Sequence, residues 1–355
     1  MSLAPLVAAT SPAFLFIALA ATLAGVVVAI VRFKVHPLLA LIVGAYAMGL
    51  AAGLEPARLM SGLTGGFGRT LSSIGIVIAC GCMIGTVLER SGCALVMATF
   101  MVRLVGKARA VLAMSCTGAV VSIPVFCDSG YVILSPLGRS LARATGASLA
   151  SFAVALSMGL YITHCLVPPT PGPIAAAGEL KAELGMVVLV GLVVAVPTLA
   201  ATYAYAVYVG KRVHLDPGHA DASAETSSDA FVENTHATRV VSAFAPILVP
   251  VVLIALKSLA DLPGRPLGEG VVRQGLGLVG EPVTALLVGV ALAWAVVWKV
   301  GRVQFGAWCG EGLKDAGTII LITAAGGALG GVLRESPLSA AVGQWVASID
   351  LGRLS

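Results

Sequence analysis

The chain has 355 residues, of which 58% are hydrophobic and only 11% are charged. Globular domains carry about 25% charged residues, so this composition excludes an ordinary soluble protein. The net charge of +5 is small and scattered along the chain, which excludes the dense basic surface of a nucleic-acid-binding protein. Apolar runs of roughly 18 residues or more recur from end to end, and they predict an all-α, polytopic membrane protein.

The apolar runs predict the membrane spans in chain order. The Arg32 and Lys34 pair after the first run places that turn in the cytoplasm and the N-terminus outside, because basic residues concentrate on the inner side. The predicted spans are Pro12–Val31, Pro37–Leu54, Leu71–Leu88, Val111–Phe126, Leu149–Leu166, Leu184–Val209, Val240–Leu259 and Val283–Val300.

Three further segments do not fit a simple crossing. Glu55–Gly68 is broken by glycine and weakly amphipathic, which predicts a connector lying at the membrane interface. Ala94–Val105 is short and contains Arg103, so it is left open whether this segment crosses. Tyr131–Ala142 has about a dozen residues, and a re-entrant or half-length helix fits that length better than a span of ~20 residues.

An internal repeat is visible when the chain is shifted by 245 residues. The shift aligns Pro37 with Pro282, and it aligns the pair Gly81 and Gly85 with Gly326 and Gly330. These glycines are expected to permit close helix contacts. Chance similarity between apolar helices is the alternative.

The basic flanks indicate that the two copies are inverted. Arg32 and Lys34 precede the first copy, whereas Lys299 and Arg302 follow the second. Inverted repeats with broken helices are a recurrent transporter architecture.

The repeat also predicts the domain organisation. Residues 1–212 form a first transmembrane repeat, the polar loop 213–239 is a linker, and residues 240–355 form a second repeat. At a spacing of 245, the equivalents of Asp128 and His164 would fall beyond Ser355, so the second repeat is expected to be incomplete.

Ionisable residues mark a candidate site within the first repeat. Asp128 and His164 each lie at the end of an apolar segment, next to proline and glycine. Ionisable groups beside interrupted membrane helices usually belong to a substrate or ion pathway. Asp128 is therefore a candidate for proton coupling, and His164 is a candidate for binding a substrate carboxylate. The alternatives are an aspartate that caps the Tyr131 helix and a histidine that bonds a backbone carbonyl.

The proline-rich segment after His164 predicts a helix break. It would expose carbonyl groups and a new helix N-terminus near Ile174, which suits an anion. Ser157 and Tyr161 on the preceding helix are expected to pack. The predicted substrate and proton site comprises Asp128, Ser129, Thr163, His164, Pro168, Pro169, Thr170, Pro171 and Gly172.

Two sequence strings resemble the gluconate permease family of proton-coupled sugar-acid symporters. They are Ile-Pro-Val-Phe-Cys-Asp-Ser-Gly at 123–130 and Thr-His-Cys-Leu-Val-Pro-Pro-Thr-Pro-Gly-Pro at 163–173, with Arg32-Phe-Lys34 upstream. The resemblance covers essentially the whole chain in order. It implies uptake of gluconate-like hydroxy acids with protons across the bacterial inner membrane, by alternating access. The same resemblance implies the inverted-repeat architecture of the ion-transporter superfamily. Thr170 departs from the histidine that gluconate-transporting members often have, and the family's second half-site motif is absent from this sequence.

The resemblance implies a transporter that acts on a small organic anion and protons within the lipid bilayer, with no nucleic acid, cofactor or metal. The seven cysteines show no metal-ligand spacing, and a homo-oligomer is compatible with the sequence. One alternative is a transport-inactive fragment of such a permease. Another is an intramembrane hydrolase using Ser129 with His164, although the chain has no nucleophile-elbow motif.

Overall fold

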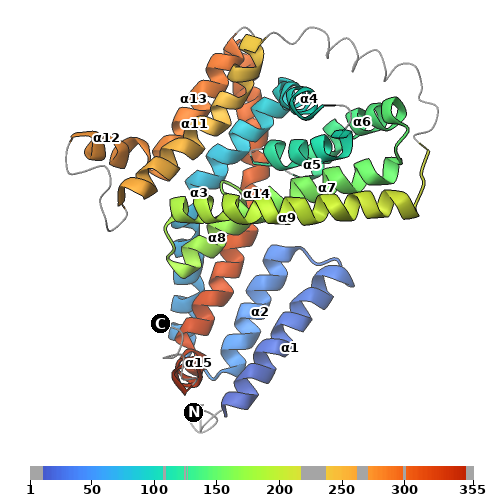
Figure 1. Ribbon diagram of the computed structural model, residues 1–355. Coiled ribbons are helices and arrows are strands. Elements are labelled where there is room, and N and C mark those ends of the chain that lie inside the picture. The colour runs from blue at the N-terminus through green and yellow to red at the C-terminus, as the bar shows by residue number, and fades with distance from the viewer. Residues whose placement is uncertain are drawn as a thin grey trace. The chain divides into compact units, whose positions relative to one another are not determined.

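The computed structural model describes residues 11–106, 109–123, 125, 127–216, 237–261, 271–298 and 301–348 (Figure 1). These residues form helices joined by turns and contain no strand, which confirms the all-α prediction. The helices are α1 Pro12–Val31, α2 Pro37–Ala51, α3 Pro56–Arg90, α4 Cys93–Val105, α5 Ala110–Val121, α6 Cys127–Thr145, α7 Leu149–Leu166, α8 Pro171–Leu180, α9 Leu184–Arg212, α11 Ala237–Asp261, α12 Val271–Val279, α13 Pro282–Val296, α14 Arg302–Glu335 and α15 Pro337–Ser348.

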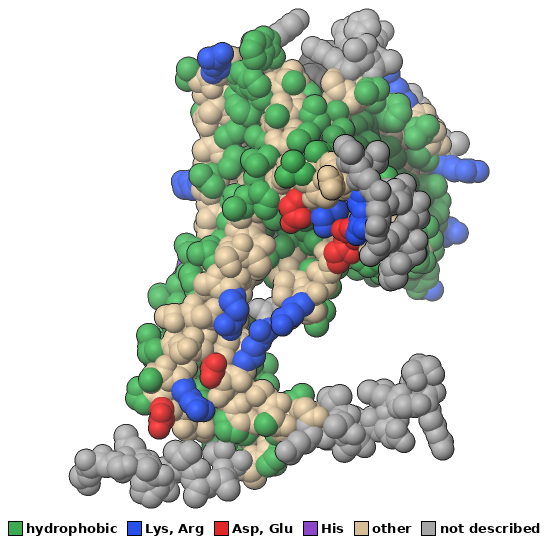
Figure 2. Space-filling model, turned by 90° about the vertical axis from the view of Figure 1, so that its left-hand side faces the viewer, with side chains coloured by type: hydrophobic (Ala, Val, Ile, Leu, Met, Phe, Trp, Pro, Cys, Tyr) green, Lys and Arg blue, Asp and Glu red, His purple; other side chains and the backbone are tan. Residues whose placement is uncertain are grey.

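Among the described residues, six helices are long and apolar enough to cross a membrane. A seventh crossing is present if α12 and α13, which are bent by 69° at their junction, count as one broken span. Hydrophobic side chains are spread over much of the upper part of the face shown in Figure 2, where they alternate with backbone and small polar surface. The polytopic membrane prediction is therefore confirmed. The six helices are Pro12–Val31, Pro56–Arg90, Leu149–Leu166, Leu184–Arg212, Val240–Asp261 and Arg302–Glu335.

Two helices, α1 and α7, begin directly after a serine whose side chain caps the first turn. The Ser11 hydroxyl accepts a hydrogen bond from the Phe14 amide at 3.3 Å, and Pro12 occupies the first helical position of α1. Proline is suited to that position because its missing N–H would have no intrahelical partner. At α7, the Ser148 hydroxyl accepts from the Ala150 amide at 3.2 Å. Local sequence therefore fixes where these helices start.

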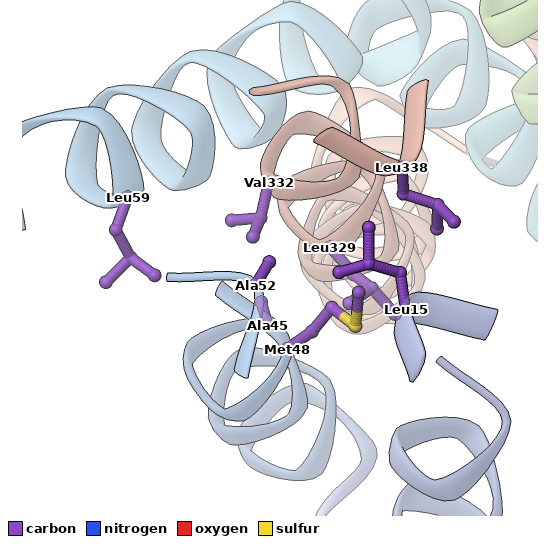
Figure 3. Packing of buried hydrophobic residues seen from close by; sticks show 8 residues of the cluster. All are labelled: Leu15, Ala45, Met48, Ala52, Leu59, Leu329, Val332 and Leu338. Atoms are coloured by element: carbon purple, nitrogen blue, oxygen red, sulfur yellow. The ribbon is translucent and has the colours of Figure 1, made fainter. Parts of the chain in front are cut away.

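The chain divides into two compact units, Met1–Gly75 with Thr318–Ser355 and Ile76–Gly317. The first unit contains an apolar core built from α1, α2, α3, α14 and α15 (Figure 3). Met48 and Val332 at its centre are fully buried. The residues of this core are Leu15, Ala45, Met48, Ala52, Leu59, Leu329, Val332 and Leu338.

Glycines bring α3 and α14 into backbone contact within this first unit. A Cβ added at Gly66 would lie 2.2 Å from the Gly327 carbonyl oxygen, and one added at Gly331 would lie 2.1 Å from the Gly62 oxygen. Residue numbers rise along α3 as they fall along α14, so the two helices are antiparallel here. Small residues favour such contacts in membranes because they let two helices pack closely. Moving an apolar side chain from lipid to a helix contact gives no hydrophobic stabilisation, since lipid is equally apolar.

Glycines have the same role in the second unit, between α5 and α7. A Cβ at Gly159 would lie 2.3 Å from the Ser115 carbonyl oxygen, and one at Gly118 would lie 2.8 Å from the Leu156 oxygen. On the next helix, α9, Gly191 leaves room for the Leu166 carbonyl at the end of α7. The segments that carry the candidate site therefore lie in a tightly packed group of helices.

Ion pairs surround the bend between α12 and α13. The Lys257 ammonium at the end of α11 lies 3.3 Å from a carboxylate oxygen of Asp261 and 3.7 Å from one of Glu281, the residue before α13. Arg273 on α12 lies 3.5 Å from Asp261. These pairs connect the end of α11 to both sides of the bend.

Two predictions about the spans are wrong. Glu55–Gly68 is not an interfacial connector, because α3 runs unbroken through it from Pro56 to Arg90. Its glycines do not break the helix, since Gly62 and Gly66 face α14 instead. The predicted span Val111–Phe126 is the 12-residue helix α5, which ends at Val121 before the proline and is too short to cross alone.

The helix boundaries follow the predicted repeat. Adding 245 to the bounds of α2, residues 37 and 51, gives 282 and 296, which are those of α13. The same shift takes the end of α3 at Arg90 to the end of α14 at Glu335. With the antiparallel contact of α3 and α14 in the first unit, this agreement favours inverted copies.

The glycines singled out by the repeat do not all make close contacts. A Cβ at Gly326 or Gly330 would meet nothing within 4 Å, so the expected close contact is wrong for these two. The neighbouring residues Gly327 and Gly331 face α3 instead. Most of the predicted linker, residues 217–236, lies outside the described residues.

We expect Gly66→Ala to destabilise the protein by about 1–3 kcal/mol, because the new methyl group would overlap the Gly327 carbonyl and force the helices apart. The measurement is the midpoint of thermal unfolding of the purified protein in detergent. Gly68→Ala is the matched control, since its added methyl group meets nothing within 4 Å on the same helix. An unchanged midpoint for Gly66→Ala would contradict the close packing described here.

Candidate functional site

The predicted break after His164 is present. α7 ends at Leu166, and α8 begins at Pro171, with residues 167–170 forming a turn between them. Val167 is extended, with φ −121° and ψ 119°, as expected for a residue that precedes proline. The new helix N-terminus is therefore at Pro171 rather than near Ile174.

Backbone groups at this turn find partners within the protein. The Val167 amide donates to the Thr163 carbonyl at 2.8 Å, and the Thr170 hydroxyl donates to the Val167 carbonyl at 2.8 Å. The Thr170 hydroxyl provides no capping hydrogen bond to α8. The turn is thus closed locally. In the first turn of α8, Pro171 and Pro173 have no N–H and the Ile174 amide donates to the Thr170 carbonyl at 3.4 Å, so the Gly172 amide alone is left for another partner.

A second interruption lies between α5 and α6. α5 ends at Val121, α6 begins at Cys127, and Ser122 between them is fully buried. The Ser122 hydroxyl donates to the Val125 carbonyl at 3.4 Å and lies 3.7 Å from the Cys127 sulfur. Asp128 lies in the first turn of α6, where a negative charge is favoured by the helix dipole.

The two interruptions meet at one small apolar cavity. Ile123 contributes from the first, and Pro168 and Pro169 contribute from the second. The cavity holds about 20 Å³, roughly the room for one water molecule, and its apolar lining disfavours water. The other residues that line it are Val77, Gly81, Ile84, Leu184, Val188, Pro246, Ile247, Pro250, Val251, Ile254 and Leu286.

Asp128 and His164 lie close enough to interact electrostatically, which connects the start of α6 with the end of α7. The His164 side chain is half-buried, whereas Asp128 is exposed. Asp128 faces a hollow of about 340 Å³ between these two helices. The residues that line the hollow are Cys127, Asp128, Tyr131, Val132, Ser157, Leu160 and Tyr161.

The predicted site residues divide into three groups. Asp128 lines the hollow and lies within electrostatic reach of His164, which does not line it, and Pro168 and Pro169 lie at the apolar cavity. Gly172 is exposed in the first turn of α8. The Ser129 and Pro171 side chains lie outside the described part of the structure.

The two predicted threonines bond to the protein itself. Thr163 is buried, and its hydroxyl donates to the Ala119 carbonyl of α5 at 2.6 Å. Thr170 is also buried and bonds to Val167 as described above. Both hydroxyls therefore hold the ends of the interrupted helices in place.

Sequence reasoning missed three residues at the hollow. Ser157 and Tyr161 were expected to pack, but both line the hollow, and Tyr161 is 55% exposed. Tyr131 lines it from α6. The available signal was spacing, because Ser157, Tyr161 and His164 recur at intervals of four and three residues, which place them on one face of α7.

This arrangement has a definite chemical capacity. A carboxylate and an imidazole, which both exchange protons, lie together at the ends of two interrupted helices. The hollow beside Asp128 has room for a small solute.

Comparison with known proteins gives a consistent result. A family model described as GntP family permease matches residues 14–354. An uncharacterized permease of Haemophilus influenzae is 34% identical over 331 residues, which cover 91% of this chain and 68% of that protein. A gluconate permease of Pseudomonas aeruginosa is 34% identical over 282 residues, covering 79% of this chain and 62% of that protein.

An inner membrane permease of Escherichia coli, YgbN, is 29% identical and covers 93% of this chain. The match includes 75% of that protein's length. The chain thus spans between 62% and 75% of the length of these three relatives.

We expect Gly81→Val to shift the turn at 167–170, because a Cβ at Gly81 already lies 3.3 Å from the Cβ of Pro169 and valine adds two methyl groups. Cys165, which is exposed and next to His164, reports the shift through its rate of labelling by a maleimide, followed by peptide mass spectrometry. The labelling rate should change by about threefold or more, in line with a 0.7 kcal/mol change in local opening.

Gly326→Val is the matched control for this measurement. It occupies the equivalent position of the second copy, and a Cβ there meets nothing within 4 Å. Equal labelling rates in the wild type and in both variants would show that Gly81 does not support the turn.

Proposed function

Because the chain belongs to the GntP permease family, we propose that it imports gluconate or a related small hydroxy-acid anion together with protons by alternating access. The chain is a multi-pass protein of the bacterial inner membrane. The main support for the proposal is the meeting of two helix interruptions beside Asp128 and His164. The gluconate permease of Pseudomonas aeruginosa supports the substrate class.

The electrostatics of the pair support a role for His164 in binding the substrate carboxylate. An imidazole N–H can donate a hydrogen bond to a carboxylate, and hydrogen bonds to charged groups are stronger than those between neutral groups. The Gly172 amide, in the first turn of α8, adds one backbone donor at the positive end of that helix dipole. The acid group of the substrate would therefore lie on the His164 side of the site.

Asp128 supplies the physical reason for proton coupling. When the substrate anion binds, its carboxylate and that of Asp128 share one imidazole, and their mutual repulsion favours uptake of a proton by the pair. By linkage, a bound proton strengthens anion binding by the same factor. Substrate and proton would then load and leave together.

We expect the purified chain in proteoliposomes to accumulate labelled gluconate above equilibrium when the outside is made acidic. A protonophore should reduce the signal to the level of equilibration, because the proton gradient supplies the driving force. If vesicles that contain the protein take up no more gluconate than empty vesicles, with or without the proton gradient, the proposal is contradicted. That result would favour the alternative of a chain without transport activity of its own.

We expect Asp128→Asn to abolish proton-driven accumulation, since the amide cannot take up the coupled proton. Exchange of internal for external gluconate should persist, because it needs no net proton movement. Asp216→Asn is the control, since its side chain is 88% exposed beyond the end of α9. Accumulation by Asp128→Asn at the wild-type level would remove this residue from the coupling step.

A further inference from the structure

The hollow between α6 and α7 has a lining that the transport proposal leaves unused. Besides Asp128 it contains the hydroxyl groups of Tyr131, Ser157 and Tyr161, with Leu160 and Val132 as apolar surface. Its volume of about 340 Å³ lies at the lower end of the range for small-molecule sites, roughly 300–1,000 Å³. The size and the mixture of polar and apolar groups suit a short, hydroxylated carbon chain.

The hydrogen-bonding capacity of the lining matches alcohol groups. The Ser157 hydroxyl donates to the Ala153 carbonyl at 2.8 Å, so its oxygen is left to accept from a solute. Each tyrosine hydroxyl can both donate and accept, and the Asp128 carboxylate accepts. A polyhydroxy chain offers a donor and an acceptor at each hydroxyl group, and it can satisfy all four of these side chains.

Charge determines which end of a hydroxy acid can occupy the hollow. The Asp128 carboxylate repels another carboxylate, so the acid group cannot lie beside it without taking up a proton. His164 lies within electrostatic reach of Asp128, and an imidazole N–H can donate a hydrogen bond to the acid group. The uncharged, hydroxylated end is therefore left for the hollow.

The hollow is open to solutes on one side and is bounded by closely packed residues of α6 and α7 on the other. Tyr161 is 55% exposed, so a solute reaches its hydroxyl without a rearrangement of the helices. Below it, Leu160 is buried, and a Cβ added at Gly130 would lie 2.8 Å from the Leu160 side chain, which shows how closely α6 approaches α7. Walls of this kind can discriminate between solutes by shape and hydrogen bonding.

Neighbouring spaces do not suit the same ligand. The apolar cavity at Pro168 and Pro169 has room for about one water molecule. A larger groove of about 540 Å³, along α8 and α9, is lined by apolar residues with Glu183 and Cys165 as its polar members. Neither offers the hydroxyl groups of the hollow.

We propose that the hollow binds the hydroxylated chain of the transported acid and that Tyr131, Ser157 and Tyr161 select polyhydroxy acids over acids with few hydroxyl groups. This selection rests on the proposed function for the position of the carboxylate. It assigns the three side chains to specificity, separate from the coupling role of Asp128 and His164.

The test is equilibrium binding of labelled gluconate and labelled glycerate to the purified full chain in detergent. Tyr131→Phe, Ser157→Ala and Tyr161→Phe each remove one hydroxyl group and keep most of the side-chain volume. Each variant should weaken gluconate binding by about two- to tenfold, the equivalent of one hydrogen bond. Binding of glycerate, whose short chain reaches less of the hollow, should change by less than about twofold.

Tyr205→Phe is the matched control. Tyr205 is 52% exposed, close to the value for Tyr161, but it lies on α9 and stacks against Tyr208 outside the hollow. This variant should bind both acids like the wild type. The ratio of the two affinities, rather than either affinity alone, separates selection from a general structural role.

Each result decides the inference. An equal loss for both acids, or no loss in any of the three variants, overturns it. A wild-type chain that binds gluconate without accumulating it in vesicles contradicts the transport proposal, while the affinity ratios still decide the role of the hollow. A wild-type chain that binds neither acid overturns both.

Discussion

A membrane helix can be interrupted only where the surrounding protein takes over the hydrogen bonds and the space that the missing turn leaves. The turn at 167–170 meets this constraint through short-range bonds, from the Val167 amide to Thr163 and from the Thr170 hydroxyl to Val167. Gly191 leaves room for the Leu166 carbonyl at the last residue of α7. Without this support the polar groups of the turn would face lipid at a cost of several kcal/mol each.

The same constraint explains why so many helix contacts in this protein depend on glycine. Lipid is as apolar as leucine, so two helices gain little from burying large apolar side chains against each other. They gain instead from close backbone approach, which the pair Gly118 and Gly159 gives to α5 and α7, and which Gly66 and Gly327 give to α3 and α14. Close approach of α5 and α7 also lets Thr163 reach the Ala119 carbonyl. Packing and the position of the site are therefore linked through small residues.

Sequence alone was sufficient for the class of fold and for the break after His164, but it carried the span from Val111 to Phe126, past the end of α5 at Val121. Composition indicated the membrane environment, and the prolines from 168 to 173 indicated where α7 stops, because proline lacks the amide that continues a helix. It failed on α3, where glycines within Glu55–Gly68 indicated a break. Those glycines instead face another helix far away in the sequence, and that contact cannot be read from local propensity.

The candidate site shows the same limit at the scale of side chains. Asp128 and His164 were found because ionisable groups are rare in apolar segments. Tyr161 and Ser157 were assigned to packing because their chemistry is ordinary, and only the position of α6 shows that this face of α7 borders a hollow. Tertiary contacts thus decide whether an ordinary polar residue belongs to the site.

The two helix interruptions also join environments of opposite character. Ile123, Pro168 and Pro169 line an apolar cavity of about 20 Å³, while Asp128, a few residues from Ile123, faces a hollow of about 340 Å³. An ion in the hollow cannot enter the apolar cavity, because transfer of a charge into such surroundings costs many kcal/mol. Passage of an anion through this part of the protein therefore requires the contacts around Pro168 and Pro169 to separate. Those contacts include Gly81, which lies against Pro169, and the two prolines of α11 at 246 and 250, which line the same cavity.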